Sequence, residues 1–259
     1  MEDNQKNSEL EPIKSQPPIV VSGSKKDWTS YVKEFLMLFL AVFAGFMAEN
    51  YREELNNKDR EKNYIKSLID DLKTDTINLN ISIDDAFEKE KGMDTLLDII
   101  PRLTDGYDSV LHQKMSSIRN YTNFIKADKT MQQLKYSGAM QLIKNQPASD
   151  AITNYDLLNK NLDAYATSLE TMFQNLRVSR YELIDMVDLQ RDLKTKTWSE
   201  LAANKKKYLL KIDPALFGKF NNQIYGFKNL SILIREKEES IKVEATKLIL
   251  MLQQKYNLQ

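Results

Sequence analysis

Residues 214–256, PALFGKFNNQIYGFKNLSILIREKEESIKVEATKLILMLQQKY, carry a core-type side chain at alternating intervals of three and four residues. This is the heptad pattern of a helix that buries one seam against partner helices. Asp213 followed by Pro214 provides an N-cap and a proline at the first helical position. The predicted seam, which includes two polar positions, is Phe217, Phe220, Ile224, Phe227, Ser231, Ile234, Glu238, Ile241, Ala245, Leu248 and Leu252.

The same alternation predicts two further long helices, at about Leu55 to Ile99 and Ala148 to Lys194. The first predicted seam is Ile65, Leu68, Leu72, Thr76, Leu79, Ile83 and Ala86. The second is Tyr155, Leu158, Leu162, Tyr165, Leu169, Met172, Leu176, Ser179, Leu183 and Met186. The 259 residues include only 7 glycines and 6 prolines, too few for the turns of a many-stranded fold. We therefore expect an all-α fold, an elongated antiparallel helical bundle with coiled-coil-like packing.

The segments between the long helices are less regular. Residues 108–145, interrupted by Ser137-Gly138, predict shorter helices that form either a fourth bundle helix or a distal cap. Residues 194–212 form a basic linker, and its candidate anionic-lipid patch is Lys205, Lys206, Lys207 and Lys211. A solvated loop is the alternative for this linker, because runs of charge usually face water.

The N-terminal part contains 14 consecutive residues without a polar side chain, from Phe35 to Ala48. That length alone would suit a buried core helix. However, the run is apolar on every face, and Tyr31 and Tyr51 place aromatic side chains at both ends of a 21-residue stretch. We predict a single transmembrane helix within residues 28–52, between a disordered tail (1–27) and an extramembrane bundle (53–259), with the bilayer as a partner. Its membrane-facing side chains would include Phe35, Leu36, Phe39, Phe43 and Phe46.

Small residues recur four apart in this helix, at Ala41, Ala44, Gly45 and Ala48. Small side chains let two membrane helices approach closely, so this face is a candidate helix–helix contact in a homo-oligomer. The alternative is that alanine and glycine are simply frequent in membrane spans.

The composition argues against many kinds of chemistry. The chain has no cysteine and one histidine, His112, which leaves no sequence pattern for a zinc or di-iron site. Its glycines are too scattered for a phosphate-binding loop, and its net charge of zero argues against nucleic acid as a partner. We therefore expect no metal, no cofactor and no enzymatic activity.

Three stretches, at residues 33–53 (KEFLMLFLAVFAGFMAENYRE), 64–72 (YIKSLIDDL) and 131–145 (MQQLKYSGAMQLIKN), follow one another along the chain. In this order they resemble an uncharacterised bacterial family of single-pass helical membrane proteins, designated only as a domain of unknown function. The similarity covers residues 33–155, with Tyr51 standing where the family pattern often has tryptophan. The resemblance implies a bacterial inner-membrane protein and brings no activity, ligand or site residue with it.

Three functions remain open from the sequence, and the weakest of them is an enzyme that uses only Asp, Glu, Lys, Ser or Tyr side chains. The long seams favour a non-enzymatic, membrane-anchored interaction or scaffold protein. The alternative is a sensory ectodomain that binds a small ligand within the bundle, which a polar cluster facing inward would indicate. Basic residues are almost balanced across the span, so the positive-inside rule gives only a slight preference for a bundle on the outer, periplasmic side.

Overall fold

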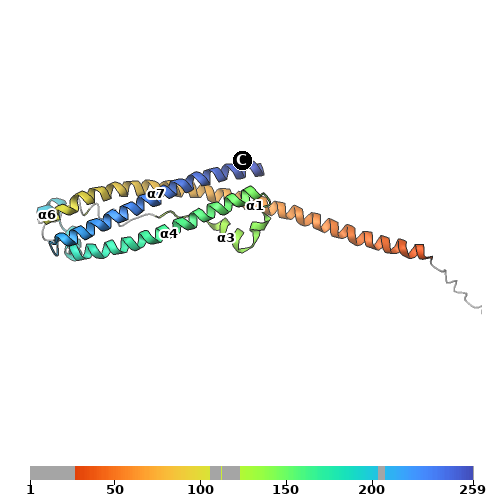
Figure 1. Cartoon of the computed structure of the whole chain (residues 1–259), viewed down its shortest axis with the longest axis horizontal. Helices are drawn as coiled ribbons and strands as arrows, with labels where there is room; N and C mark the ends of the chain where they lie inside the picture. Colours follow the sequence, from red (N-terminus) through yellow and green to blue (C-terminus); the bar gives the residue numbers. More distant parts are fainter. Residues whose placement is uncertain (1–26, 106–111, 113–122, 204–207, 259) are drawn as a thin grey trace, which may run out of the picture. The chain divides into compact units, whose positions relative to one another are not determined.

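The computed structural model describes residues 27–105, 112, 123–203 and 208–258. Among these residues the regular structure is helical, apart from an isolated bridge between Ile184 and Leu209, so the all-α prediction is confirmed (Figure 1). The chain divides into two compact units, Met1–Glu54 and Leu55–Gln259. The predicted disordered tail, residues 1–27, lies outside the described residues except for Asp27.

The first unit is described from Asp27 onward and consists of the beginning of helix α1 (Trp28–Ile99). Every side chain from Tyr31 to Asn50 is exposed. In the described part of the chain, α1 is the one helix that is long and apolar enough to cross a membrane.

The second unit is built on three long helices: α1 from Leu55 onward, α4 (Gln146–Leu183) and α7 (Pro214–Tyr256) (Figure 1). The predicted bounds of α7 are confirmed, and so is each of its eleven predicted seam positions, all of which are buried. Residue numbers increase along α7 as they decrease along α1 in the contacts between the two helices. These contacts are Lys228 to Asp94, Arg235 to Glu90, Glu238 to Ser82 and Tyr256 to Glu61. Lys219, near the start of α7, pairs with Glu182 at the end of α4, so α7 runs antiparallel to both other long helices.

The seams of α1 and α4 differ from the predicted ones by single residues. On α1 the buried positions are Asp75 and Ser82, while the predicted Thr76 and Ile83 are only half-buried. The predicted α4 seam residues Tyr165 and Met172 are only half-buried, and the predicted Met186 belongs to the next helix. Asn159 on α4 is buried in place of Leu158. The prediction was wrong here because it chose the more apolar of two neighbours, whereas the helical register selects the polar one.

Short elements return the chain from the end of α1 to the start of α4. Residues 123–128, here called the strap, are non-helical and lead into α3 (Lys129–Tyr136) and a 3-10 turn, η2 (Ala139–Leu142). The strap and the residues after it bond to successively earlier positions on α1: the Ile125 carbonyl to Asn78, the Ala127 amide to Asp75, the Thr130 amide to Asp71 and the Lys144 amide to Glu61. Short helices are thus confirmed in residues 123–145, and these residues form no fourth long helix. The rest of the predicted segment, residues 108–122 apart from His112, lies outside the described residues.

The opposite end of the second unit is closed by η1 (Ile100–Asp105), α5 (Met186–Leu193) and α6 (Trp198–Ala203). The predicted continuation of α4 to Lys194 is wrong, because Ile184 adopts an extended conformation and bridges to Leu209. Asp185 then caps α5 by accepting hydrogen bonds from the amides of Val187 and Asp188.

Candidate functional site

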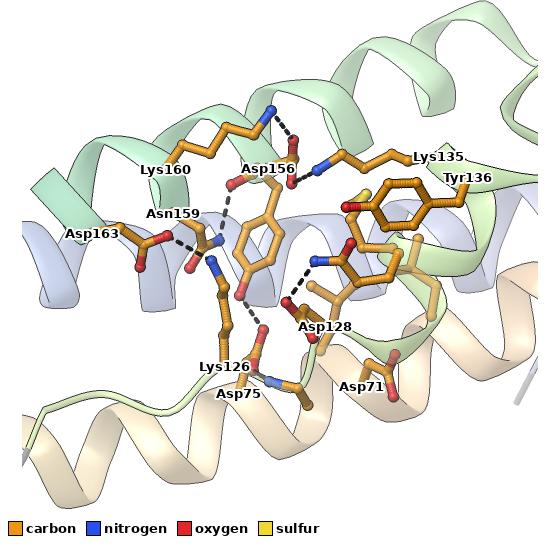
Figure 2. A pocket seen from close by; sticks show the side chains of 16 residues that line it. Asp71, Asp75, Lys126, Asp128, Lys135, Tyr136, Asp156, Asn159, Lys160 and Asp163 are labelled. Atoms are coloured by element: carbon orange, nitrogen blue, oxygen red, sulfur yellow. Dashed lines mark hydrogen bonds and ion pairs between the residues drawn. The ribbon is translucent and has the colours of Figure 1, made fainter. Parts of the chain in front are cut away.

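A cavity of about 360 Å³ lies between α1, α3, α4 and the strap. Cavities of roughly 300–1,000 Å³ hold small molecules in other proteins. Apolar residues at its wall include Leu68, Leu72 and Met131. The polar and charged side chains that line it are Asp71, Asp75, Lys126, Asp128, Gln132, Lys135, Tyr136, Tyr155, Asp156, Asn159, Lys160 and Asp163 (Figure 2).

Asp75 is the buried carboxylate of this cavity, with only 2% of its surface exposed. Its Oδ2 accepts a hydrogen bond from the Tyr155 hydroxyl at 2.6 Å, and its Oδ1 accepts one from the Ala127 amide at 2.6 Å. Burial raises the pKa of Asp75, the two hydrogen bonds oppose that shift, and the nearby charges of Asp71 and Asp128 add to it. The strap and α4 are therefore tied to α1 through one carboxylate.

Tyr155 and Asn159 reach the cavity from successive turns of α4. Burial, followed by the charge and the hydrogen bond of Asp75, raises the pKa of the Tyr155 phenol, so this group remains a hydrogen-bond donor. The Asn159 side chain is only 5% exposed, and its Nδ2 donates to the Tyr155 carbonyl at 2.9 Å. Its Oδ1 is buried and accepts no hydrogen bond from any described residue. A buried acceptor without a donor costs about 1–3 kcal/mol, so a hydrogen bond from water or a ligand would stabilise this atom.

Lysines of the cavity are engaged by the outer aspartates. Lys126 pairs with Asp163 at 2.7 Å, while Lys135 and Lys160 both pair with Asp156, at 2.7 and 3.1 Å (Figure 2). These contacts lower the pKa of Asp156, although partial burial of its carboxyl group works against them. Each lysine of the cavity is thus held in an ion pair, and the five aspartates that line the cavity exceed its three lysines by two.

Asp71 and Asp128 complete the acidic lining. Asp71 Oδ2 accepts from the Thr130 amide at 2.8 Å, and Asp128 Oδ2 accepts from Gln132 Nε2 at 2.9 Å. Asp128 is also the N-cap residue of α3, but its side chain makes no capping hydrogen bond. Within the described residues, neither of these carboxylates forms an ion pair, and the same holds for Asp75.

A second buried carboxylate, Glu238, lies outside the cavity on α7. It is 2% exposed, and its Oε1 accepts a hydrogen bond from the Ser82 hydroxyl at 2.9 Å. Burial raises the pKa of Glu238 to about 7, while bonds from Ser82 and the Phe124 backbone act in the opposite direction. The strap thus passes over two buried acids, at Ala127 and at Phe124.

The residues predicted from the sequence lie elsewhere. The predicted membrane-facing side chains Phe35, Leu36, Phe39, Phe43 and Phe46 are all exposed, as are the small residues Ala41, Ala44, Gly45 and Ala48. Of the predicted lipid patch, Lys205, Lys206 and Lys207 lie outside the described residues. Lys211 pairs with Asp213 at 2.9 Å, beside the N-terminus of α7 and at the opposite end of the second unit from Leu55.

The cavity residues Asp75 and Asn159 were missed because the predicted seams passed through their less polar neighbours, Thr76 and Leu158. Asp75 follows Leu72 by three residues and precedes Leu79 by four, so it occupies a seam position of the heptad pattern. Asn159 likewise occupies a seam position, because it follows Tyr155 by four residues and precedes Leu162 by three. A polar residue at a seam position was the available signal.

Among the described residues, no group of three or more His, Asp or Glu side chains is placed to hold a metal ion. What the cavity offers is carboxylates, an amide oxygen and an apolar wall. Comparison of the chain with protein-family models, with curated proteins and with solved structures finds no match.

Proposed function

We propose that this chain is a single-pass membrane protein whose helical bundle binds a small polar ligand in the cavity between α1, α3 and α4. The observation that carries the proposal is the buried Asn159 Oδ1 in the cavity wall, which no described residue supplies with a donor. Polar groups buried in this way are normally satisfied by protein, water or ligand. A ligand with hydrogen-bond donors would satisfy this one.

The membrane part of the proposal is supported by exposure and length. Phe35, Phe39 and Phe43 are each about half exposed or more, and they stack along one side of α1 with ring centroids 6.3 and 6.0 Å apart. A soluble core helix would bury such side chains, because apolar surface in water is unfavourable by about 25 cal/mol per Å². The stretch from Tyr31 to Tyr51 is about 30 Å long at 1.5 Å per residue, which matches the hydrocarbon thickness of a bilayer.

Localisation in a bacterial inner membrane, with the bundle on the periplasmic side, belongs to the same proposal. The chain lacks cysteine, so a single Ser8→Cys or Ser240→Cys substitution makes each side addressable by a membrane-impermeant thiol reagent. We expect labelling of intact spheroplasts at Ser240→Cys and, only after lysis, at Ser8→Cys. The reverse pattern would place the bundle in the cytoplasm.

The scaffold function favoured by the sequence stays a prediction. Its expected signature is an unbroken apolar core, whereas Asp75, Ser82 and Asn159 occupy core positions of the second unit. Recovery of a partner protein, or of a second copy of the chain, from gentle detergent would support that function. Repeated recovery of the chain alone would count against it.

Ligand binding is tested by thermal unfolding of the full-length protein in non-ionic detergent, in the presence of single small polar compounds. The panel contains amino acids, amines, carboxylates, sugars and nucleosides. Asn159→Leu removes the cavity acceptor, and Asn161→Leu, on an exposed face of the same helix, is the matched control. We expect one class of compound to raise the unfolding temperature of the parent and of Asn161→Leu only. If no compound does so, or if Asn159→Leu keeps the shift, the cavity is not the binding site.

A further inference from the structure

The charges around the cavity favour a cation. Its three lysines are held in ion pairs by Asp156 and Asp163, and this leaves three carboxylates, Asp71, Asp75 and Asp128, without a described basic partner. Like charges that share a site raise one another's free energy, and an incoming positive charge relieves that repulsion. The mutual effect is visible at Asp75, whose pKa is raised by the charges of Asp71 and Asp128 as well as by burial.

The hydrogen-bonding groups of the cavity favour an organic cation over a metal ion. A metal needs several oxygen ligands converging at about 2.0–2.6 Å, and no such group occurs among the described residues. Instead the carboxylates already accept neutral donors: both oxygens of Asp75 accept one, from Tyr155 and Ala127, whereas Asp71 and Asp128 each accept one at a single oxygen, from Thr130 and Gln132. The buried Asn159 Oδ1 requires an N–H or O–H donor. An ammonium group carries three such donors and no acceptor.

The shape of the acidic lining favours two ammonium groups joined by an apolar chain. Asp71 and Asp75 are four residues apart on α1, a spacing that places side chains about 5–6 Å apart along one helix face. Asp75 is buried and Asp71 is half-buried, so the two carboxylates lie at different depths. Leu68, Leu72 and Met131 supply apolar wall beside them, against which methylene groups would pack.

We infer that the cavity binds a short linear aliphatic diamine, with one ammonium group at Asp75 and Asn159 and the other at Asp71 and Asp128. This inference rests on the proposed ligand-binding function and specifies its ligand class. A compound that carries a carboxylate would be repelled by the negative charges of Asp71, Asp75 and Asp128. A neutral compound would not compensate those charges, so a cation is favoured over both.

The test is calorimetric titration of the full-length protein in non-ionic detergent with 1,4-diaminobutane, and separately with n-butylamine, glutamate and magnesium chloride. We expect saturable binding of the diamine, with n-butylamine weaker by about tenfold or more, and no binding of glutamate. A charge-assisted hydrogen bond is worth about tenfold to a hundredfold in affinity, which sets the size of the effect.

Variants assign the binding to the cavity. Asp75→Asn and Asp128→Asn should each weaken diamine binding by about tenfold or more, while Asp84→Asn, an exposed aspartate on α1, should leave it unchanged. Asp128 is only half-buried and accepts from one glutamine side chain, so its substitution keeps the test informative if Asp75→Asn fails to fold.

Each outcome separates this inference from the proposed function. Equal binding of n-butylamine and 1,4-diaminobutane, or unchanged binding in both cavity variants, would overturn the diamine. Binding of magnesium instead of the diamine would overturn it as well. If the diamine fails while another compound gives a shift that depends on Asn159, the diamine is wrong and the ligand-binding function stands. If nothing binds, both fail.

Discussion

Glu238 makes the stability of the helical bundle depend on pH in a direction opposite to that of most carboxylates. Its side chain is 2% exposed, Oε2 accepts no hydrogen bond, and no described basic side chain forms an ion pair with it. Burial raises its pKa from the ordinary 4.5 to about 7. Between these two values the folded protein binds a proton that the unfolded chain has released. The free energy of unfolding therefore falls as pH rises through this window, and it is unaffected by this group below it.

The magnitude follows from the width of the window. One pKa unit corresponds to about 1.4 kcal/mol, so a shift from 4.5 to about 7 corresponds to a loss of about 3 kcal/mol by pH 8. For a bundle of this size that loss lowers the unfolding temperature by roughly 6–12 °C. Glu238→Gln removes the titration and keeps an acceptor for the Ser82 hydroxyl. It introduces a buried amide donor whose cost of about 1–3 kcal/mol does not depend on pH.

The assay is thermal unfolding followed by circular dichroism, on the full-length protein in non-ionic detergent, from about pH 4 to about pH 8. We expect the difference in unfolding temperature between Glu238→Gln and the parent to move in favour of the variant as pH rises, by roughly 6–12 °C in total. Glu236→Gln, on the exposed face of the same helix turn, is the control and should follow the parent. Parallel curves for Glu238→Gln and the parent would refute the reasoning, because they would mean that the pKa of Glu238 is the same in the folded protein as in the unfolded chain.

Four further substitutions test the fold by urea unfolding. Gly138→Ala should destabilise the protein by about 1 kcal/mol, because Gly138 adopts a φ of 67° between α3 and η2. Gly218→Ala should instead stabilise it by about 0.5–1 kcal/mol, because this glycine is in regular helix and a Cβ would meet nothing within 4 Å; the same sign for both substitutions would contradict the argument. Tyr155→Phe should cost about 1–2 kcal/mol at neutral pH and less in acid, where Asp75 is protonated; a loss independent of pH would show that the hydroxyl does not stabilise the carboxylate. Leu79→Ala, at a fully buried seam position, should cost about 2–5 kcal/mol, and a value below 1 kcal/mol would mean that the seam is loosely packed.

The heptad pattern of the sequence was sufficient to predict a helix and its buried face where the seam is largely apolar and capping residues mark the end of the helix. α7 is the clearest case: its bounds, its Asp213 N-cap and all eleven buried positions agree with the heptad pattern. Register on a helix follows from geometry, so each position three or four residues further along returns to the same face. The two polar members of that seam, Ser231 and Glu238, were found because the prediction kept the spacing of three and four residues between the apolar seam positions on either side of them.

The cavity could not be predicted from short stretches of sequence, because its residues are brought together by contacts between distant parts of the chain. Asn159 lies beside Leu158, and hydropathy alone predicts that the leucine is buried. Asp75 lies beside Thr76, and hydropathy gives no reason for the aspartate to be the buried one. Asp75 is tolerated in the core because Tyr155 and the Ala127 amide, 80 and 52 residues away in the chain, supply its donors. The end of α4 at Leu183 is likewise set by a distant partner, since Leu209 and Tyr208 pair with the extended backbone there.

The sequence by itself therefore determined the helical class, the apolar exposed start of α1 and the seam of α7, because each depends on periodicity within one segment. Only the tertiary structure decided which way the chain returns from α1 to α4, which acids are buried and where a cavity opens. Those features arise where backbone and side chains distant in sequence satisfy one another's hydrogen bonds, and a buried polar group is stable only when such partners are present.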